Sequence, residues 1–499
     1  MISIAVKRVT NWPALAWVCK VEREPASVRT WCGSRVEQIG NTIFEAAWDG
    51  SVTPINLDSS SLVIGTGFVL REKNITFVPS SNTVDRIWLI KEKFGGWVSN
   101  SLPALLATSG AQLRDDYFLY HRDLATIIHG IDRYKQHVPL KNGEAEVIYY
   151  QNLVFDWDNW RREDKTDHTP SFDTFDAYYT YLLDTASRLA SNATTRHRKF
   201  PLELLTTIST GYDSPTAAVV ARHAGCRKAL TLTRARSRFH RSDSGMRIAD
   251  RLNLECDAYD NHKAITSEPY FWSVLGEPAD ANLSAFQFPD TPSVLFTGFN
   301  GDILWDSQEH KLTNRCVRKD LTGLGLCEYR LHAKFLHCPV PFWGIMRAAE
   351  IQKLSISPSL KPWSIDGKYN RPICRRIVED AGVPRDWFGI KKKATTLSPY
   401  AERRPITRDA RERFKLFVRE RNITMVPNWI LRLSSQIDED IMSHIRDITG
   451  TNLPKTWINS RAEKMVFQWA VNEIAFMYRE GLKNEHPSSP EGLSTMSAK

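Results

Sequence analysis

The feature that most constrains this chain is a strand–turn–helix unit at residues 204–225. Residues 204–208 are apolar and β-branched enough for a short central strand, and apolar residues recur at helical spacing from Ala217 onward. Between them, Gly211 allows the backbone to bend and to approach a ligand closely. Such a unit is typical of a parallel α/β sheet, whose ligands bind beyond the carboxyl ends of the strands.

The turn and the start of the helix suit an anion. Asp213 and Ser214 can cap the helix, and Pro215 fits its first turn because proline has no N–H to lose. Free N–H groups and the positive end of the helix dipole attract phosphate. An ordinary strand–turn–helix, in which Asp213 is only a cap, is the alternative explanation of the same residues.

A second strand runs into a glycine turn at residues 293–305, and this turn carries an acid, Asp302. Because Asp213 and Asp302 follow separate strands, we expect them to meet at one edge of the sheet and to share one or two magnesium ions. Magnesium takes oxygen ligands and usually keeps phosphate oxygens and waters as well. The alternative is that Asp302 is a turn aspartate.

A third segment, residues 371–396, begins a helix at Pro372, ends it at Gly382 and continues into a loop with three lysines at residues 391–393. A fixed cation beside a departing pyrophosphate or oxyanion lowers the barrier to reaction. A solvated loop is the ordinary explanation of three consecutive lysines.

In this order, the segments resemble the asparagine synthetase-like family of N-type ATP pyrophosphatases, which includes β-lactam synthetases and lasso-peptide cyclases. Residues 209–214, Ser-Thr-Gly-Tyr-Asp-Ser, are similar to its pyrophosphate loop Ser-Gly-Gly-x-Asp-Ser. Residues 297–303, Thr-Gly-Phe-Asn-Gly-Asp-Ile, resemble its Ser-Gly-x-Gly-x-Asp-Glu segment. Thr210 and Asn300 replace glycines, and Ile303 replaces the glutamate. Thr210 would crowd the loop, and Ile303 removes one anchor for the metal.

The resemblance implies a role for each of these residues. The loop would hold the pyrophosphate of ATP, and adenine would lie near the end of the next strand and the second glycine turn. The nucleotide-binding residues would be Ser209, Thr210, Gly211, Tyr212, Asp213, Ser214, Leu232 and Gly298. Magnesium would bind Asp213 and Asp302. Catalysis falls to Asp213 and to Lys392, which would stabilise charge as an acyl-adenylate forms and collapses; Lys391 and Lys393 fit nearly as well. Tyr369 and Glu379 are candidates for the base that deprotonates the amine, and the spacing favours neither.

The N-terminal third contains short β-like runs between turn residues, at residues 2–6, 61–70, 75–78, 86–90, 96–99 and 145–150. Residues 44–50, 97–106 and 130–150 loosely resemble the amidotransferase domain that precedes the synthetase domain in this family. That glutaminase needs a cysteine exposed by removal of Met1, whereas this chain has Ile2 there and its first cysteine at Cys19. We therefore expect no release of ammonia from glutamine.

The expected fold is α/β. A β-rich αββα (Ntn-hydrolase-like) sandwich, a degenerate glutaminase-like domain at residues 1–165, would precede a parallel-sheet ATP pyrophosphatase (HUP-like) domain with a helical C-terminal part at residues 175–483. A disordered tail would occupy residues 484–499. Further elements are expected as a strand at residues 229–233 and as helices at residues 242–253, 411–421 and 461–482.

The resemblance implies an ATP-dependent ligase that forms an amide bond. A small-molecule or peptide carboxylate would attack ATP and release pyrophosphate. An amine other than ammonia from glutamine would then displace AMP, with ring closure within one substrate as one option. Two alternatives are an adenylating enzyme that modifies a tRNA base and a non-catalytic nucleotide-binding relative. The basic charge favours the first, although no RNA-binding module is apparent, and the replacements Thr210 and Ile303 favour the second.

Composition is that of a soluble enzyme. The 499 residues are 42% hydrophobic and carry a net charge of +9 with a pI near 9.0, which favours anionic partners such as ATP, acidic peptides or nucleic acid. The most basic patch, residues 234–241, either reaches phosphates or is solvated. No apolar run approaches a membrane span, and the short run at residues 12–18 contains a proline and makes a poor signal peptide. We expect a cytoplasmic protein without structural zinc. Nucleic acid is not favoured as a partner, and the sequence leaves open whether the protein forms a homodimer.

Overall fold

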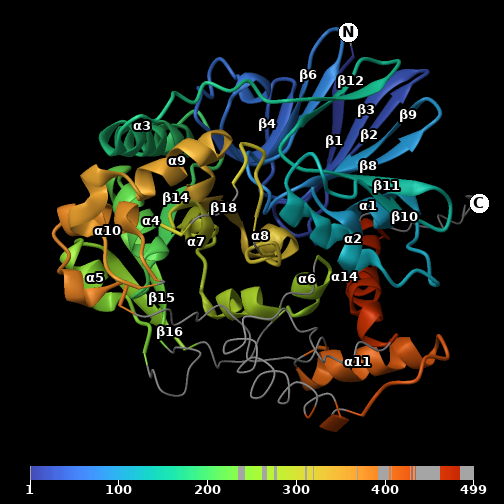
Figure 1. Cartoon of the computed structure of the whole chain (residues 1–499). Helices are drawn as coiled ribbons and strands as arrows, with labels where there is room; N and C mark the ends of the chain where they lie inside the picture. Colours follow the sequence, from blue (N-terminus) through green and yellow to red (C-terminus); the bar gives the residue numbers. More distant parts are fainter. Residues whose placement is uncertain are drawn as a thin grey trace, which may run out of the picture.

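The computed structural model describes residues 2–233, 242–260, 267–274, 278–308, 312–318, 320–367, 369–390, 404–405, 407–427, 429–430, 433 and 461–483. Three sheets organise this part of the chain (Figure 1). Two of them come from residues before 165 and pack on each other. The third, purely parallel, comes from residues 203–339.

The first two sheets form an N-terminal sandwich. One is seven-stranded, with the order β1 (Ile4–Arg8), β3 (Ala26–Cys32), β2 (Trp17–Arg23), β9 (Gly95–Ser99), β8 (Ile87–Glu92), β11 (Glu144–Ile148) and β10 (His137–Pro139). The other is six-stranded, with the order β13 (Trp160–Glu163), β12 (Asn152–Phe155), β7 (Ile75–Val78), β6 (Val63–Leu70), β5 (Thr42–Trp48) and β4 (Glu37–Ile39). All strand pairs in them are antiparallel except β1 with β3.

Alternation of side chains along the strands builds the core of this sandwich. Trp17, Cys19 and Val21 of β2 face Phe68 and Leu70 of β6 across the space between the sheets, and all five are buried. Residues two apart on a strand point to the same face, so each strand supplies one apolar row to the shared core.

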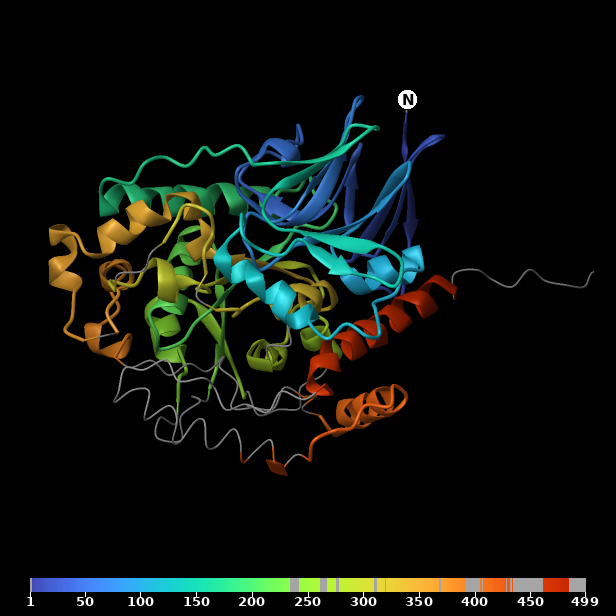
Figure 2. The ribbon, with the colours of Figure 1, turned by 45° about the vertical axis from the view of Figure 1, so that its right-hand side comes forward.

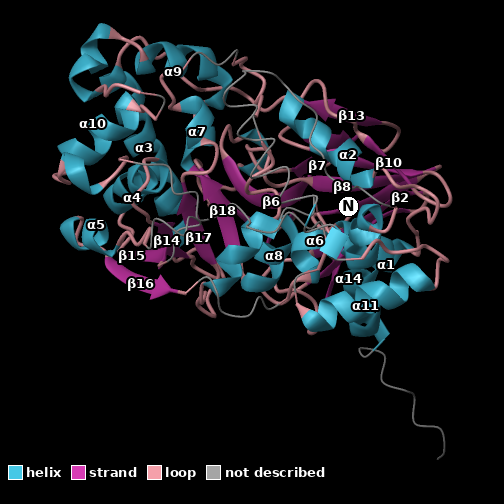
Figure 3. Ribbon diagram, turned by 60° about the horizontal axis from the view of Figure 1, so that its bottom comes forward, coloured by secondary structure: helices cyan, strands magenta, loops and turns pink. Residues whose placement is uncertain are grey.

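The parallel sheet has the order β16 (Glu255–Tyr259), β15 (Lys228–Leu232), β14 (Glu203–Thr207), β17 (Ser293–Thr297) and β18 (Phe335–Pro339). Its first strand in the chain, β14, lies at the centre, so the strand order reverses between β14 and β17. Helices α3 (Phe175–Thr194), α4 (Asp213–His223), α5 (Met246–Arg251) and α10 (Pro372–Asp380) surround it (Figure 3). In such sheets ligands bind at the carboxyl ends of the strands beside the reversal.

Helices connect the two parts. Helix α14 (Val466–Lys483) packs against α1 (Leu102–Ser109) and α6 (Pro269–Trp272) and runs beneath the sandwich (Figure 2). The Trp12 indole N–H donates to the carbonyl of Tyr478 on α14 at 2.9 Å. The edge strand β18 lies beside β5 and β6 (Figure 3). The remaining helices are α2 (Tyr120–Ala125), α7 (Gly301–Leu304), α8 (Leu326–Ala333), α9 (Ala348–Ser355) and α11 (Arg408–Arg419).

The expected mixed α/β class with a parallel sheet is confirmed. Each strand expected in the N-terminal third and around the two glycine turns is present, with its ends shifted by at most two residues. The helix expected at residues 242–253 is shorter, because α5 begins only at Met246, after a turn at Gly245. Among the described residues, no helix is both long enough and apolar enough to cross a membrane.

A buried ion network around Arg330, on α8, joins the two parts. Its Nε donates to Asp85 at 2.6 Å, and its two Nη atoms donate to Glu45 of β5 at 2.7 and 3.0 Å. The three side chains are at most 1% exposed. Helix α8, which follows β17 of the parallel sheet, therefore places the charge of Arg330 inside the N-terminal sandwich.

Replacing Arg330 with methionine (Arg330→Met) would leave Glu45 and Asp85 buried without their counter-charge. We expect a loss of about 3–5 kcal/mol in the free energy of unfolding, because an uncompensated buried charge is strongly unfavourable. Urea denaturation measures it. In the control Arg29→Met, which breaks an exposed pair with Glu22, the loss should stay below about 1 kcal/mol. A loss no larger for Arg330→Met than for the control would contradict this role.

Glu328, also on α8, makes stability depend on pH. It accepts hydrogen bonds from the Ser101 hydroxyl at 2.8 Å and from the Leu102 amide at 3.1 Å. Burial raises the pKa of Glu328 from 4.5 to about 7, outweighing the bond from Ser101, which lowers it. The folded protein then keeps a proton that the unfolded chain releases, so this contribution is present at low pH and is lost as pH rises toward 7.

The Glu328→Gln variant should lack this pH dependence. As pH rises from 4.5 to about 7, the wild type should lose about 3 kcal/mol of unfolding free energy relative to Glu328→Gln. Urea denaturation at several pH values in this window measures it. A difference that stays constant would contradict the assignment.

Candidate functional site

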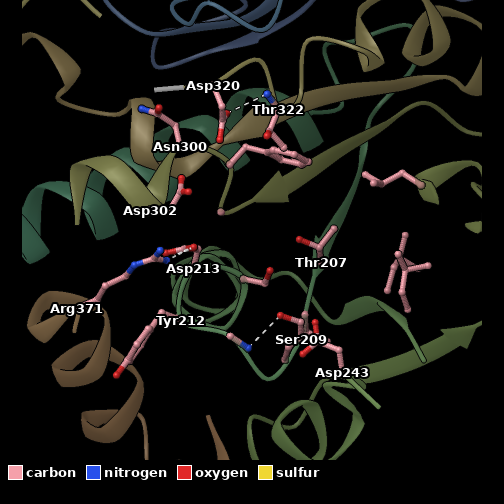
Figure 4. A pocket seen from close by; sticks show the side chains of 18 of the residues that line it. Thr207, Ser209, Tyr212, Asp213, Asp243, Asn300, Asp302, Asp320, Thr322 and Arg371 are labelled. Carbon is pink, nitrogen blue, oxygen red and sulfur yellow. Dashed lines mark hydrogen bonds and ion pairs between the residues drawn. The ribbon is translucent and has the colours of Figure 1, made fainter. Parts of the chain in front are cut away.

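A cavity of about 220 Å³ lies where β14, β15 and β17 end (Figure 4). Its wall is formed by Thr207, Ile208, Ser209, Gly211, Tyr212, Asp213, Ser214, Leu230, Leu232, Asp243, Leu283, Phe286, Gly298, Phe299, Asn300, Asp302, Asp320, Thr322, Tyr369 and Arg371. They include residues of both glycine turns, of β15 and of the segment before α10. The structure thus brings together residues that the sequence separates by more than 150 positions.

The turn after β14 leaves room for a ligand at Gly211. A Cβ added there would meet only the Ser209 hydroxyl at 3.4 Å and the Tyr369 hydroxyl at 3.6 Å, which are ordinary contacts. Gly211 donates its amide to Ser209 Oγ at 3.2 Å. A side chain at this position would therefore project into the cavity, and glycine keeps the cradle open.

The expectation that Asp213 or Ser214 caps helix α4 is wrong. The residue before the helix is Tyr212, whose side chain makes no capping hydrogen bond, and Asp213 is the first helical residue. The carboxylate of Asp213 is instead held by Arg371, which draws it toward α10. The start of α4 therefore presents uncapped backbone at the cavity wall.

Thr210 does not crowd the loop, contrary to our expectation. Its hydroxyl donates to Asp243 Oδ1 at 2.5 Å and its amide donates to the same oxygen at 3.2 Å. Thr210 itself is not among the residues of the cavity wall. The carbonyl of Thr210 accepts from the amide of Gly389 at 2.9 Å. Ser209 pairs with Ser244 in an isolated bridge. The loop is thus braced by the segments before α5 and after α10.

The second glycine turn packs directly on Asp213. A Cβ at Gly298 would lie 2.4 Å from the Asp213 carbonyl carbon, and one at Gly301 would lie 2.6 Å from Asp213 Oδ1. A side chain at Gly298 would displace the backbone of the first turn, and one at Gly301 would displace the carboxylate of Asp213. Asn300, where the family has glycine, adopts φ +73°, and asparagine is one of the few other residues that tolerate this conformation.

Arg371 and Asp213 form an ion pair at the cavity wall (Figure 4). The Arg371 side chain is 3% exposed and its guanidinium lies over the rings of Tyr369 and Tyr212, at 5.2 and 5.9 Å from their centroids. Burial opposes the charge on Arg371, but the attraction of Asp213 more than compensates, so the pKa of Arg371 is raised. Arg371 therefore carries a positive charge in the folded protein.

Asp302 lines the same cavity as Asp213, and Ile303 is buried away from it. No group of three or more His, Cys, Asp or Glu side chains in the described residues has the arrangement of a metal site. Magnesium is commonly held by one or two carboxylates together with substrate phosphates. The carboxylate oxygens of Asp213 and Asp302 are therefore suited to hold magnesium when the phosphates of a nucleotide supply its other ligands.

The opposite wall is apolar. Leu232, at the end of β15, is 7% exposed and lines the cavity together with Leu230, Leu283 and Phe286. Gly298 lines it as well. A flat apolar group of a ligand can bury its surface here while a charged group lies against the turn after β14.

Of the two candidate bases, Tyr369 lines the cavity, and burial raises its pKa, although Arg371 lowers it in part. Its hydroxyl therefore keeps its proton at neutral pH and is a hydrogen-bond donor to a ligand. Glu379 is no part of the wall, and its carboxylate accepts from Arg385 Nε at 2.7 Å and Nη2 at 2.9 Å. Only Tyr369 of this pair lies where it can reach a ligand in the cavity.

Sequence reasoning missed Arg371, Asp243 and Asp320 as wall residues. The only sequence signal for Arg371 is its position directly before Pro372, which starts a helix. Lys391, Lys392, Lys393 and the basic patch at residues 234–241 lie outside the described residues.

Comparison with known proteins found no matching family model, and no curated protein matched.

The packing of the turns predicts different effects for two glycines. Gly298→Ala should lower the free energy of unfolding by about 1–3 kcal/mol, because its methyl group would overlap the Asp213 backbone. Gly211→Ala should change it by less than about 0.5 kcal/mol, because the methyl group would make only ordinary contacts with two hydroxyl groups. Urea denaturation measures both, and equal losses would contradict the assignment of Gly211 to an open cradle.

Proposed function

We propose that this protein is an ATP-dependent carbon–nitrogen ligase of the asparagine synthetase-like family, which forms an amide through an acyl-adenylate and releases AMP and pyrophosphate. The observation that carries the proposal is the open cradle at Gly211, beside the uncapped start of α4 and in one cavity with Asp213 and Asp302. Backbone amides and a helix N-terminus at the carboxyl end of a central parallel strand suit a pyrophosphate group.

ATP fits the two walls of the cavity. Its adenine would lie on the apolar wall near Leu232 and Gly298, and its pyrophosphate would lie against residues 209–214. The braces from Thr210 to Asp243 and to Gly389 hold the loop in place without a ligand. Little ordering of the loop is then needed on binding, which favours both affinity and positioning.

Asp213 and Asp302 would hold Mg²⁺, which when bound supplies positive charge to the phosphates. Lys392, or a neighbouring lysine, would stabilise the charge that develops as pyrophosphate leaves. Gly389, one of the last described residues before these lysines, is hydrogen-bonded to Thr210 in the phosphate loop, which supports this placement of the segment.

The acyl group would come from a small-molecule or peptide carboxylate and the nitrogen from an amine other than glutamine-derived ammonia. We assign the N-terminal sandwich to a glutaminase-like αββα (Ntn-hydrolase-like) domain and the parallel sheet to a HUP-like ATP pyrophosphatase domain. Two face-to-face sheets, with α1 packed on β2 and β9, support the first assignment. We propose a cytoplasmic location.

The test is a screen for carboxylate-dependent release of pyrophosphate from ATP, with mass spectrometry of the product. Gly211→Val should fold like the wild type, because a Cβ there makes only ordinary contacts with two hydroxyl groups. It should lose both ATP binding and pyrophosphate release, because its side chain would project into the proposed phosphate site. Thermal unfolding verifies the fold, and titration with ATP measures binding. A Gly211→Val protein that binds ATP normally would contradict the proposal.

The two alternatives make different predictions. A non-catalytic relative would bind ATP and release no pyrophosphate with any carboxylate; the replacements that suggested it, Thr210 and Ile303, both have side chains outside the cavity wall. A tRNA-modifying enzyme would shift bulk tRNA in a gel and adenylate it.

A further inference from the structure

Arg371 is the one arginine among the described residues that lines the cavity. It stands directly before α10, and its guanidinium reaches Asp213 at the start of α4. The guanidinium has five N–H donors. Nη1 donates to Asp213, while Nε is buried without a hydrogen-bond partner. Arg371 therefore has N–H donors that are not used by Asp213, at the wall where we place the pyrophosphate.

A second buried arginine, Arg330, uses more of its donors than Arg371 does. Arg330 donates from Nε, Nη1 and Nη2 to two carboxylates. Arg371 is comparably buried and pairs through one nitrogen with one carboxylate. Because Arg371 lines the cavity, a ligand bound there can accept hydrogen bonds from the donors that Asp213 does not use.

The aromatic rings around Arg371 keep the guanidinium in place while allowing its partner to change. Tyr369 and Tyr212 lie beside it, and Tyr212 is itself held by a hydrogen bond from Arg375 at 2.5 Å. Contacts with aromatic faces stabilise a cation without occupying its N–H groups. The donors of Arg371 therefore stay available in the plane of the guanidinium.

We propose that Arg371 binds the β- and γ-phosphates of ATP and that its ion pair with Asp213 is exchanged for those phosphates when the nucleotide binds. This inference rests on the proposed function. Arginine suits the exchange because its planar donors bind carboxylate and phosphate with the same geometry. Without nucleotide, Arg371 neutralises Asp213 and makes it a poor ligand for a divalent cation. When the nucleotide is bound, Arg371 pairs with its phosphates, and Asp213 becomes available to bind the metal.

The test compares Arg371→Met and Arg371→Lys with Arg376→Met. Arg376 is on the same helix, pairs with Asp176 and Asp380, and is outside the cavity wall, so its substitution controls for the loss of a cation from α10. Calorimetric titrations measure the affinities of each protein for ATP, inorganic pyrophosphate and AMP. Thermal unfolding measures folding.

Arg371→Met should weaken binding of ATP and pyrophosphate about 10- to 100-fold, the effect of losing charged hydrogen bonds, and leave AMP binding unchanged. Arg371→Lys, which keeps the charge, should lose less. Mn²⁺ alone should bind more tightly to Arg371→Met than to the wild type, because Asp213 is no longer neutralised. Arg376→Met should match the wild type throughout.

Other outcomes separate the two proposals. Equal losses for ATP, pyrophosphate and AMP in both Arg371 variants would reduce Arg371 to a structural residue and overturn the inference. Unchanged ATP binding in Arg371→Met would also overturn it while leaving the proposed function intact. A wild-type protein that binds neither ATP nor pyrophosphate would overturn the proposed function and, with it, this inference.

Discussion

The close contact of the two glycine turns at Asp213 is the constraint on which the site depends. The turn after β17 touches the backbone and the carboxylate of Asp213 through Gly298 and Gly301, and α10 reaches the same carboxylate through Arg371. Three segments far apart in the chain therefore fix one residue at the start of α4. This contact sets the width of the crevice at the point where the strand order of the parallel sheet reverses, and so determines what fits between the turns.

The N-terminal sandwich supports the same cavity from behind. Arg318, in the segment that leads to the wall residues Asp320 and Thr322, donates to the carbonyl of Thr83 in the sandwich at 3.3 Å. A Cβ at Gly323 would lie 3.2 Å from Phe299 in the second glycine turn and 3.3 Å from Val84. The network around Arg330 secures this junction a few residues further on. The N-terminal sandwich thus has a physical task at the cavity, since it supports one wall of the proposed site.

Much of the fold could be predicted from local patterns. The expected strands are present, whereas the helices expected at residues 242–253 and 461–482 begin later in the chain. Gly298 and Asp302 do lie in one cavity with Asp213, because parallel strands bring their carboxyl ends to one edge. The fate of single side chains could not be predicted in this way. Thr210 turns toward Asp243, and Asp213 pairs with Arg371, because of contacts between segments separated by more than 30 and 150 residues. A residue-by-residue comparison with a motif contains no information about such partners.

The charges of the cavity wall explain why the proposed site needs cations. Its described charged residues are four carboxylates, Asp213, Asp243, Asp302 and Asp320, and one guanidinium, Arg371. A triphosphate brought into this wall alone would be repelled, despite the net charge of +9 of the whole chain. A divalent cation bound with the nucleotide would reverse this balance locally, and release of Arg371 from Asp213 would add a second positive charge beside the phosphates. The wall is therefore suited to a nucleotide that arrives with its metal, and unsuited to the free anion.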